Sequence, residues 1–278
     1  MRARHAARTL YGMTILVTGA TGNIGRMLVD HLIALGVDDV RALTNKPEAA
    51  GLPDSVQVAK GYLGRLETLP AAFEGVDSVY LAPLERTIRE VLDIAKEAGV
   101  RHVVDLAGPP DNWWYPISQA VEASGLEWTH LWPGEFMENA TMWAPQIIET
   151  GSVSEPYPDS ANAPIAMDDI AAVAAVCLSE PGHTGQAYTL TGPESLTRTE
   201  ILRRIGDALG KNLVFDRVSR QATLEALTPS MGDFANTYVD GLEAQVEHPQ
   251  RAETTVHDLV GRSTTFAQWA LDHVEKFR

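Results

Sequence analysis

The chain has 278 residues, of which 45% are hydrophobic and 21% are charged. Its 22 basic and 37 acidic side chains give a formal net charge of −15, which disfavours binding to phosphate backbones and argues against a nucleic-acid partner. No apolar run approaches the ~20 residues of a membrane helix, so we expect no membrane partner. The single Cys177 excludes an intramolecular disulfide and, with scattered histidines, predicts no metal site and a reducing, cytoplasmic compartment.

The N-terminal residues 1–12 contain Arg2, Arg4, His5 and Arg8 but lack the apolar stretch of a secretory signal. The first predicted strand begins only after a second methionine, Met13. We therefore expect residues 1–12 to be a flexible extension or the product of an upstream start codon. A basic arm with a function of its own is the alternative.

A glycine-rich turn lies between a short apolar run, Ile15–Val17, and a helical pattern that stops at Gly36. A buried strand, a glycine turn and a helix in this order present backbone N–H groups and a helix N-terminus to a pyrophosphate. The turn therefore predicts a dinucleotide site, and a turn that has lost its ligand is the alternative. The candidate contacts in the turn are Gly19, Thr21, Gly22, Asn23, Ile24 and Gly25.

Further apolar strands are expected at residues 40–43, 56–58, 79–83, 102–107 and 126–132, and most of them are separated by helical patterns. This alternation predicts an α/β fold with a doubly wound parallel sheet. Farther along the chain, Thr197 and Glu200 have the spacing of a capping box, which predicts a helix start there.

The end of the second predicted strand reads Thr44-Asn45-Lys46 and carries no carboxylate for the ribose hydroxyls of NAD. Lys46 could instead reach a 2′-phosphate, so we expect NADP(H) as cofactor rather than NAD(H); a solvated lysine is the alternative. In a doubly wound sheet the carboxyl ends of other strands also meet the cofactor. These ends add Leu63, Pro83, Ala107 and Gly108 to the candidates.

Five of the six tryptophans lie between residues 113 and 143. Aromatic side chains at strand ends and in the following loops are typical of the apolar wall of a substrate pocket. These aromatic residues could equally be buried in the core or in an interface between chains. The candidate substrate-binding residues are Trp113, Trp114, Tyr115, Trp132, Phe136 and Asn139.

Four motifs resemble the NmrA-like group of atypical short-chain dehydrogenase/reductase proteins. They are the run Thr18–Gly25, residues 123–129, the pattern Pro133-Gly134-x-Phe136-Met137-x-Asn139 and Asp169-Ile-Ala. The resemblance implies a Rossmann-like, NADP(H)-binding core at 13–150 and a C-terminal part at 151–278 that completes the sheet and forms a small substrate lobe. It also implies cofactor contacts at Leu81, Ala82, Pro83, Pro133 and Gly134.

Three departures from that group affect the expected chemistry. Ala107 stands where a serine or threonine is common, Gln119 replaces the lysine of Tyr-x-x-x-Lys after Tyr115, and Trp132 replaces a frequent arginine. Because the usual proton donor is incomplete, the acid is open among Tyr115, His130, Glu135 and a water molecule. His130 could instead be a buried core histidine, and Glu135 could instead be a solvated loop glutamate.

The main hypothesis is an NADP(H)-dependent reductase of a small aromatic or polyketide-like carbonyl, quinone or enone, as used in secondary metabolism. One alternative is a non-redox enzyme on the same fold, such as a cyclase, dehydratase or isomerase. Another is a regulatory protein that senses NADP(H) through protein partners. We expect a small-molecule substrate and either a monomer or a homodimer.

Overall fold

The computed structural model describes residues 12–278, so the predicted extension at 1–12 lies almost wholly outside the described residues. Contacts divide the chain into two units. The first unit runs to Trp132 and also contains Ile170–Tyr188, and the second contains Pro133–Asp169 and Thr189–Arg278. The chain therefore leaves the first unit after Trp132 and returns to it over Ile170–Tyr188.

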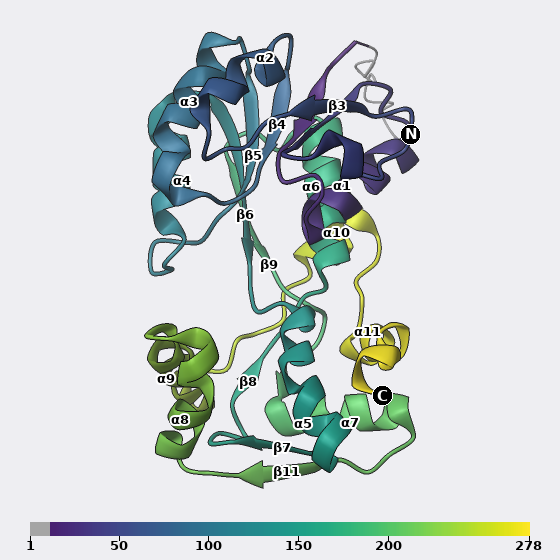
Figure 1. Ribbon diagram of the computed structural model, residues 1–278, viewed down its shortest axis with the longest axis vertical. Helices are drawn as coiled ribbons and strands as arrows, with labels where there is room; N and C mark the ends of the chain where they lie inside the picture. Colours follow the sequence, from purple (N-terminus) through teal and green to yellow (C-terminus); the bar gives the residue numbers. More distant parts are fainter. Residues whose placement is uncertain (1–11) are drawn as a thin grey trace, which may run out of the picture. The chain divides into compact units, whose positions relative to one another are not determined.

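The first unit is built on a seven-stranded sheet with the order β3-β2-β1-β4-β5-β6-β9 (Figure 1). Its first six strands pair in parallel, and the order reverses between β1 and β4. The predicted α/β class with a doubly wound sheet is thus confirmed. The strands are β1 (Ile15–Val17), β2 (Val40–Thr44), β3 (Gln57–Lys60), β4 (Ser78–Leu81), β5 (His102–Leu106), β6 (Glu127–Pro133) and β9 (Gln186–Leu190).

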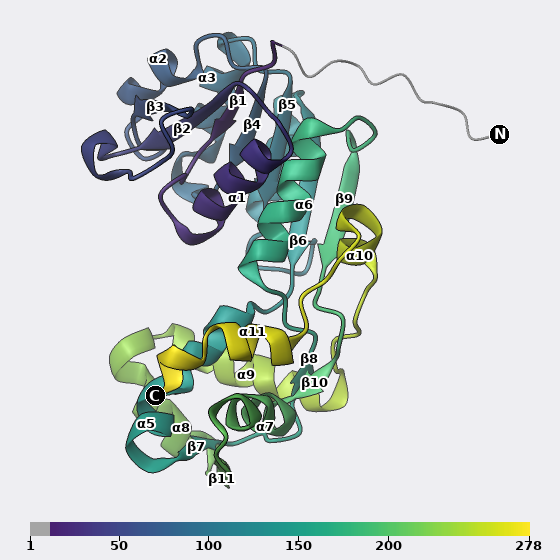
Figure 2. The same ribbon diagram turned by 90° about the vertical axis from the view of Figure 1, so that its right-hand side faces the viewer.

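Helices cover both faces of this sheet, as Figures 1 and 2 show together. One face carries α1 (Asn23–Ala34) and α6 (Met167–Ser179), and the other carries α2 (Leu69–Phe73), α3 (Ile88–Glu97) and α4 (Tyr115–Ser124). Because both faces are covered, the strands can be apolar throughout, and the three residues of β1 are fully buried. Cys177 on α6 is 1% exposed, and burial raises the pKa of its thiol to about 12. Short 3₁₀ turns in the connections are η1 (Pro47–Ala49), η2 (Leu66–Thr68) and η3 (Glu85–Thr87).

The second unit contains two small two-stranded sheets and a set of helices. β7 pairs in parallel with β11, and β8 pairs antiparallel with β10. Its core gathers around Phe266, Trp269 and Phe277, against the apolar face of α7. The predicted capping box is confirmed, because Thr197 and Glu200 exchange hydrogen bonds at the start of α7. The elements are η4 (Met137–Trp143), α5 (Ala144–Thr150), β7 (Ser152–Glu155), β8 (Ala161–Asn162), β10 (Leu196–Thr197), α7 (Arg198–Leu209), β11 (Val214–Arg217), α8 (Arg220–Met231), α9 (Phe234–Glu247), α10 (Thr255–Val260), α11 (Phe266–Asp272) and η5 (Val274–Phe277).

Across residues 12–278, no helix combines the length and the apolar character needed to cross a membrane. In the same part of the chain, no group of three or more histidine, cysteine, aspartate or glutamate side chains is placed to hold a metal ion.

Candidate functional site

The turn after β1 is fixed to β4 by one buried threonine. The Thr18 hydroxyl donates to the carbonyl oxygen of Tyr80 (2.9 Å) and accepts from the backbone N–H of Ala82 (2.8 Å). It therefore holds together the two strands at which the strand order reverses, which is where ligands bind in doubly wound sheets. Thr18 was not among the predicted site residues, because its role depends on a partner 62 residues away.

The glycines of this turn are required by its geometry. Gly19 has a φ of +62°, in the left-handed region that glycine adopts without strain. A Cβ atom on Gly25 would lie 2.2 Å from the carbonyl oxygen of Gly19, which real structures do not allow. Gly25 therefore lets α1 begin directly against the turn.

The N-terminus of α1 is left open for an anion. Its N-cap is Gly22, which supplies no side-chain cap, and its first turn carries no acidic residue. The first N–H groups of a helix lack internal partners and carry partial positive charge. A pyrophosphate fits this position because nothing on the side chains competes for those groups.

A cavity of about 420 Å³ opens at the carboxyl ends of β1, β2, β3 and β4. The predicted contacts that line it are Gly19, Thr21, Thr44, Asn45, Lys46, Leu63, Ala82 and Pro83. The predicted residues Gly22, Asn23, Ile24, Gly25 and Leu81 shape the turn and the strand end beside it without lining it. The sequence interpretation missed Leu43, Ala49, Gly61, Tyr62 and Leu84, which complete the lining.

Gly61 could have been found from the sequence, because it lies three residues after the third predicted strand at 56–58 and directly follows the observed β3. A Cβ atom there would lie 2.8 Å from Leu43 Cδ1, so the loop after β3 packs closely against β2. That close approach brings Tyr62 and Leu63 to the cavity wall.

The cavity ends at the residues that follow β2. The hydroxyls of Thr21 and Thr44 lie 3.3 Å apart, and the backbone N–H of Lys46 donates to the Thr44 hydroxyl (3.3 Å). The side chains of Asn45 and Lys46 are exposed. Among the lining residues Lys46 is the charged one, and no carboxylate is among them. This end of the cavity therefore suits an anionic group better than a pair of ribose hydroxyls seeking an acceptor.

The loop after β5 carries three of the predicted substrate-binding aromatics. Gly108 lies against Asn112, and a Cβ on Gly108 would come within 2.5 Å of the Asn112 side chain. The Asn112 side-chain oxygen accepts from the backbone N–H of Trp114 (2.8 Å), and so shapes the loop. Trp113 is 64% exposed and its ring lies 4.8 Å from that of Trp114, while Tyr115 is half-buried at the start of α4.

His130 lies in the interior of the first unit, on the face of β6 that we predicted it to share with Trp128 and Trp132. Its ring stacks on theirs, with centroid distances of 4.1 and 6.0 Å. Its Nδ1 lies 2.6 Å from Asp105 Oδ2, and its Nε2 lies 3.5 Å from a Glu122 carboxylate oxygen. His130 and Asp105 are fully buried, and burial raises the pKa of Asp105 while the hydrogen bond from His130 opposes that rise. The structure thus places His130 in a core pair.

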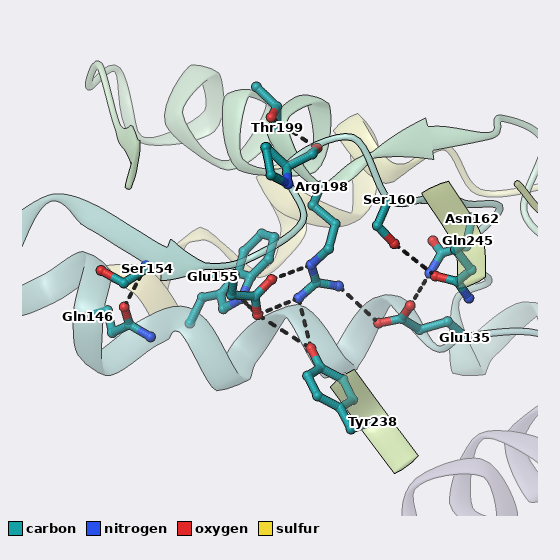
Figure 3. Close-up of polar contacts among 12 residues, drawn as sticks. Glu135, Gln146, Ser154, Glu155, Ser160, Asn162, Arg198, Thr199, Tyr238 and Gln245 are labelled. Carbon is teal, nitrogen blue, oxygen red and sulfur yellow. Dashed lines mark hydrogen bonds and ion pairs between the residues drawn. The ribbon is translucent and has the colours of Figure 1, made fainter. Parts of the chain in front are cut away.

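Glu135, in the second unit, belongs to a buried cluster of charged groups (Figure 3). Its carboxylate accepts a short hydrogen bond from the Asn162 amide, and one oxygen lies 3.6 Å from Arg198 Nη1. Arg198 is 4% exposed and also makes a two-point ion pair with Glu155, through a short contact from Nε and a 2.7 Å contact from Nη2. Tyr238 accepts from the same guanidinium (2.9 Å).

One arginine therefore faces two carboxylates in this cluster. The Trp143 ring lies beneath the guanidinium at 4.4 Å, and its indole N–H donates to Glu155 (2.8 Å). Arg198 makes two close contacts with Glu155 but only one, at 3.6 Å, with Glu135. The negative charge of Glu135 is therefore less well balanced by the guanidinium than that of Glu155. Burial raises the pKa of Glu135, and the nearby Arg198 only partly opposes that rise. Glu135 retains a 19% exposed side chain.

The remaining predicted residues lie along the segment that precedes and follows Glu135. Gly134 donates its N–H to the carbonyl of Leu190 (2.9 Å), and the Gln250 side chain occupies the space where a Cβ of Gly134 would lie. Pro133 and Phe136 are half-buried, and Asn139 is exposed.

Comparison with known proteins agrees with this geometry. Residues 19–109 match the NAD(P)H-binding family. The chain is 35% identical, over 95% of its length and 99% of the other chain, to the (4-alkanoyl-5-oxo-2,5-dihydrofuran-3-yl)methyl phosphate reductase of Streptomyces griseus. The chain belongs to the NAD(P)H-binding, NmrA-like family of atypical short-chain dehydrogenases and reductases.

Two further members of this family have similar chains. The NAD(P)H azoreductase of Xenophilus azovorans is 34% identical over 95% of this chain and 99% of its own. The NADPH-dependent quinone oxidoreductase of Escherichia coli is 25% identical, with a TM-score of 0.82 over 94% of this chain and all of the other. The predicted family, NAD(P)H cofactor and oxidoreductase class are confirmed.

Proposed function

We propose that the chain is an NADPH-dependent reductase of a small aromatic or polyketide-like carbonyl, quinone or enone. The observation that carries this proposal is the cavity that begins at Gly19 and Thr21, in the turn before the open N-terminus of α1, and ends at Lys46 without a lining carboxylate. The relatives are named as reductases of an oxo-dihydrofuran phosphate, of azo compounds and of quinones, which supports the reductase class.

In this proposal the cofactor is held mainly by backbone groups. The turn at Gly19 and the N-terminus of α1 bind the pyrophosphate, and Lys46 with Asn45 binds the 2′-phosphate of the adenosine ribose. Leu63, Ala82 and Pro83 give the cavity its apolar wall. Bound NADPH supplies a hydride, and the chain supplies the proton and the orientation of the substrate.

Calorimetric titration of NADPH and NADH tests the cofactor assignment. We expect sub-micromolar NADPH binding and weaker NADH binding. Lys46→Ala should lose roughly 10- to 100-fold in NADPH affinity with NADH binding unchanged, because a charge-assisted contact is worth about 1.5–3 kcal/mol. Lys60→Ala is the matched control, since Lys60 is exposed at the end of the neighbouring β3 but does not line the cavity. Equal affinities for the two nucleotides would contradict the assignment.

We further propose Glu135 as the proton donor. Reduction of a carbonyl, quinone or enone would leave a negative charge on the substrate oxygen. A proton from the Glu135 carboxyl would neutralise that oxygen and leave Glu135 as a carboxylate. Burial keeps this carboxyl protonated to a higher pH than an ordinary glutamate, and its side chain remains accessible. His130 is fully buried, with a carboxylate near each ring nitrogen, and Tyr115 lacks the lysine of the usual pair.

The pH dependence of kcat tests this role with a panel of quinones and enones. Because the pKa of Glu135 is raised, the rate should be constant below that pKa and fall as pH rises through it. Glu135→Gln should lower kcat by about 100-fold or more, since a general acid accelerates a reaction by about 10²–10⁴-fold. The decline of the rate with rising pH should also disappear in this variant. Glu127 is an exposed glutamate at the other end of β6, so Glu127→Gln should change neither kcat nor its pH dependence. An unchanged profile in Glu135→Gln, with loss in Tyr115→Phe, would assign the role to Tyr115. Tight NADPH binding without turnover across the panel would refute the reductase and favour a sensor.

A further inference from the structure

Two tryptophans of β6 offer a natural comparison. Trp128 and Trp132 are both half-buried, both stack on His130, and both pack against the core beneath α4. They differ in one contact, because the indole Nε1 of Trp132 donates a hydrogen bond to the Ser118 hydroxyl of α4 (3.1 Å). Trp132 therefore contributes a hydrogen bond to α4 in addition to its packing in the core.

Ser118 links Trp132 to the loop after β5 through a second hydrogen bond. Its hydroxyl is fully buried and donates to the carbonyl oxygen of Gly108 (3.0 Å). An indole N–H can only donate, and a hydroxyl has one proton. With the Trp132 donor at its oxygen, the Ser118 hydroxyl accepts from it and directs its proton to Gly108. Without that donor, the hydroxyl is free to turn toward a carbonyl of its own helix, as serines in helices commonly do.

Gly108 lies two residues after the end of β5, at the base of the loop that bears Trp113 and Trp114 and leads to Tyr115 at the start of α4. The loop is shaped internally by Asn112, which contacts Gly108 on one side and caps the Trp114 N–H on the other. The Ser118–Gly108 hydrogen bond joins the base of this loop to a buried helix position. Holding Gly108 in place therefore holds the three aromatic rings in place.

We propose that Trp132 is a positioning residue that orients the aromatic loop at residues 108–115 through Ser118 and Gly108, and so sets the affinity for a planar aromatic substrate. This inference rests on the proposed function and on the prediction that Trp113, Trp114 and Tyr115 of this loop contact the substrate. It assigns Trp132 a role other than direct substrate contact. It also accounts for an indole at a position where the resembled family often carries arginine, because the indole supplies a donor inside an apolar wall.

Binding of 2-methyl-1,4-naphthoquinone to the NADP⁺ complex tests this role without requiring turnover. The dissociation constant is measured by quenching of tryptophan fluorescence in wild type, Trp132→Phe, Trp128→Phe and Ser118→Ala. We expect Trp132→Phe and Ser118→Ala each to weaken quinone binding by about 5- to 20-fold, the size of one lost buried hydrogen bond. Trp128→Phe keeps the link and should bind the quinone as wild type does.

The double variant Trp132→Phe/Ser118→Ala should be no weaker than either single variant, because residues in one hydrogen-bond chain are not additive. NADP⁺ affinity should be unchanged throughout. Equal quinone affinities in Trp132→Phe and Trp128→Phe, or additive losses in the double variant, would overturn the positioning role. Quinone binding without turnover in wild type would instead refute the reductase function alone, and absence of quinone binding by wild type would refute both.

Discussion

The cofactor turn of the first unit and the charged cluster of the second unit are built in opposite ways. The turn is made of backbone, and its residues Gly19–Gly25 follow one another in the chain. The cluster is made of side chains, and Glu135, Glu155 and Arg198 come from separate elements. The turn therefore tolerates almost no added atom, whereas the cluster tolerates almost no lost charge. Four substitutions sharpen or break this contrast.

The largest effect is expected in the cluster. Arg198→Met should lower the free energy of unfolding by about 3–5 kcal/mol, because it leaves two buried carboxylates without their cation. Urea unfolding measures it. The matched control is Arg203→Ala on the same helix, whose ion pair with Asp207 is more than half exposed and should contribute under about 1 kcal/mol. Equal losses in the two variants would show that burial of the charges is not what matters.

The next effect is expected in the turn. Gly25→Ala should weaken NADPH binding by about 100-fold or more, because its Cβ would meet the Gly19 carbonyl oxygen at 2.2 Å and force α1 away from the turn. Calorimetry measures the affinity. Gly241→Ala in α9 is the control, since a Cβ there meets no atom within 4 Å and binding should be unchanged. Wild-type affinity in Gly25→Ala would mean that the turn does not contact the nucleotide.

A smaller effect is expected where β1 meets β4. Thr18→Val keeps the shape but removes the hydroxyl that pairs with Tyr80 and Ala82, so it should destabilise by about 1–3 kcal/mol. Thermal unfolding measures the loss. Thr199→Val removes an exposed hydroxyl bond to Pro158 and should cost less than half as much. An unchanged stability in Thr18→Val would indicate that the Tyr80 carbonyl and the Ala82 N–H find other hydrogen-bond partners.

The smallest effect is expected at the capping box of α7. Thr197→Ala should cost about 1 kcal/mol. Hydrogen bonds from Thr197 lower the pKa of Glu200, so its stabilising contribution is present above the ordinary glutamate pKa and is lost as pH falls through the lowered value. Urea unfolding between pH 7 and pH 3 should show this loss in wild type and a smaller one in Glu200→Gln. The same pH slope in both would exclude the capping carboxylate as its source.

The parts of the molecule that the sequence predicts are those set by local rules. The apolar strand at Ile15–Val17, the glycine spacing and the Thr197–Glu200 cap each depend on neighbours within a few residues. The same holds for the doubly wound sheet, since strand and helix periodicities alternate along the chain.

The parts that could not be predicted depend on distant pairings. Thr18 acts through β4, and the pairing of Asp105 with His130 appears only once β5 and β6 are aligned. The hydrogen bond from the Trp132 indole to Ser118 likewise appears only once β6 and α4 are packed together. The return of the chain to the first unit over Ile170–Tyr188 also depends on pairings between distant segments.

Under the proposed function, in which the substrates are conjugated carbonyl compounds, the burial of Cys177 has a chemical consequence. Quinones and enones are electrophiles that add to thiolates. The single cysteine of the chain is 1% exposed on α6, and burial raises the pKa of its thiol to about 12, so almost none is ionised at neutral pH. A reductase built this way resists alkylation by the molecules it would consume.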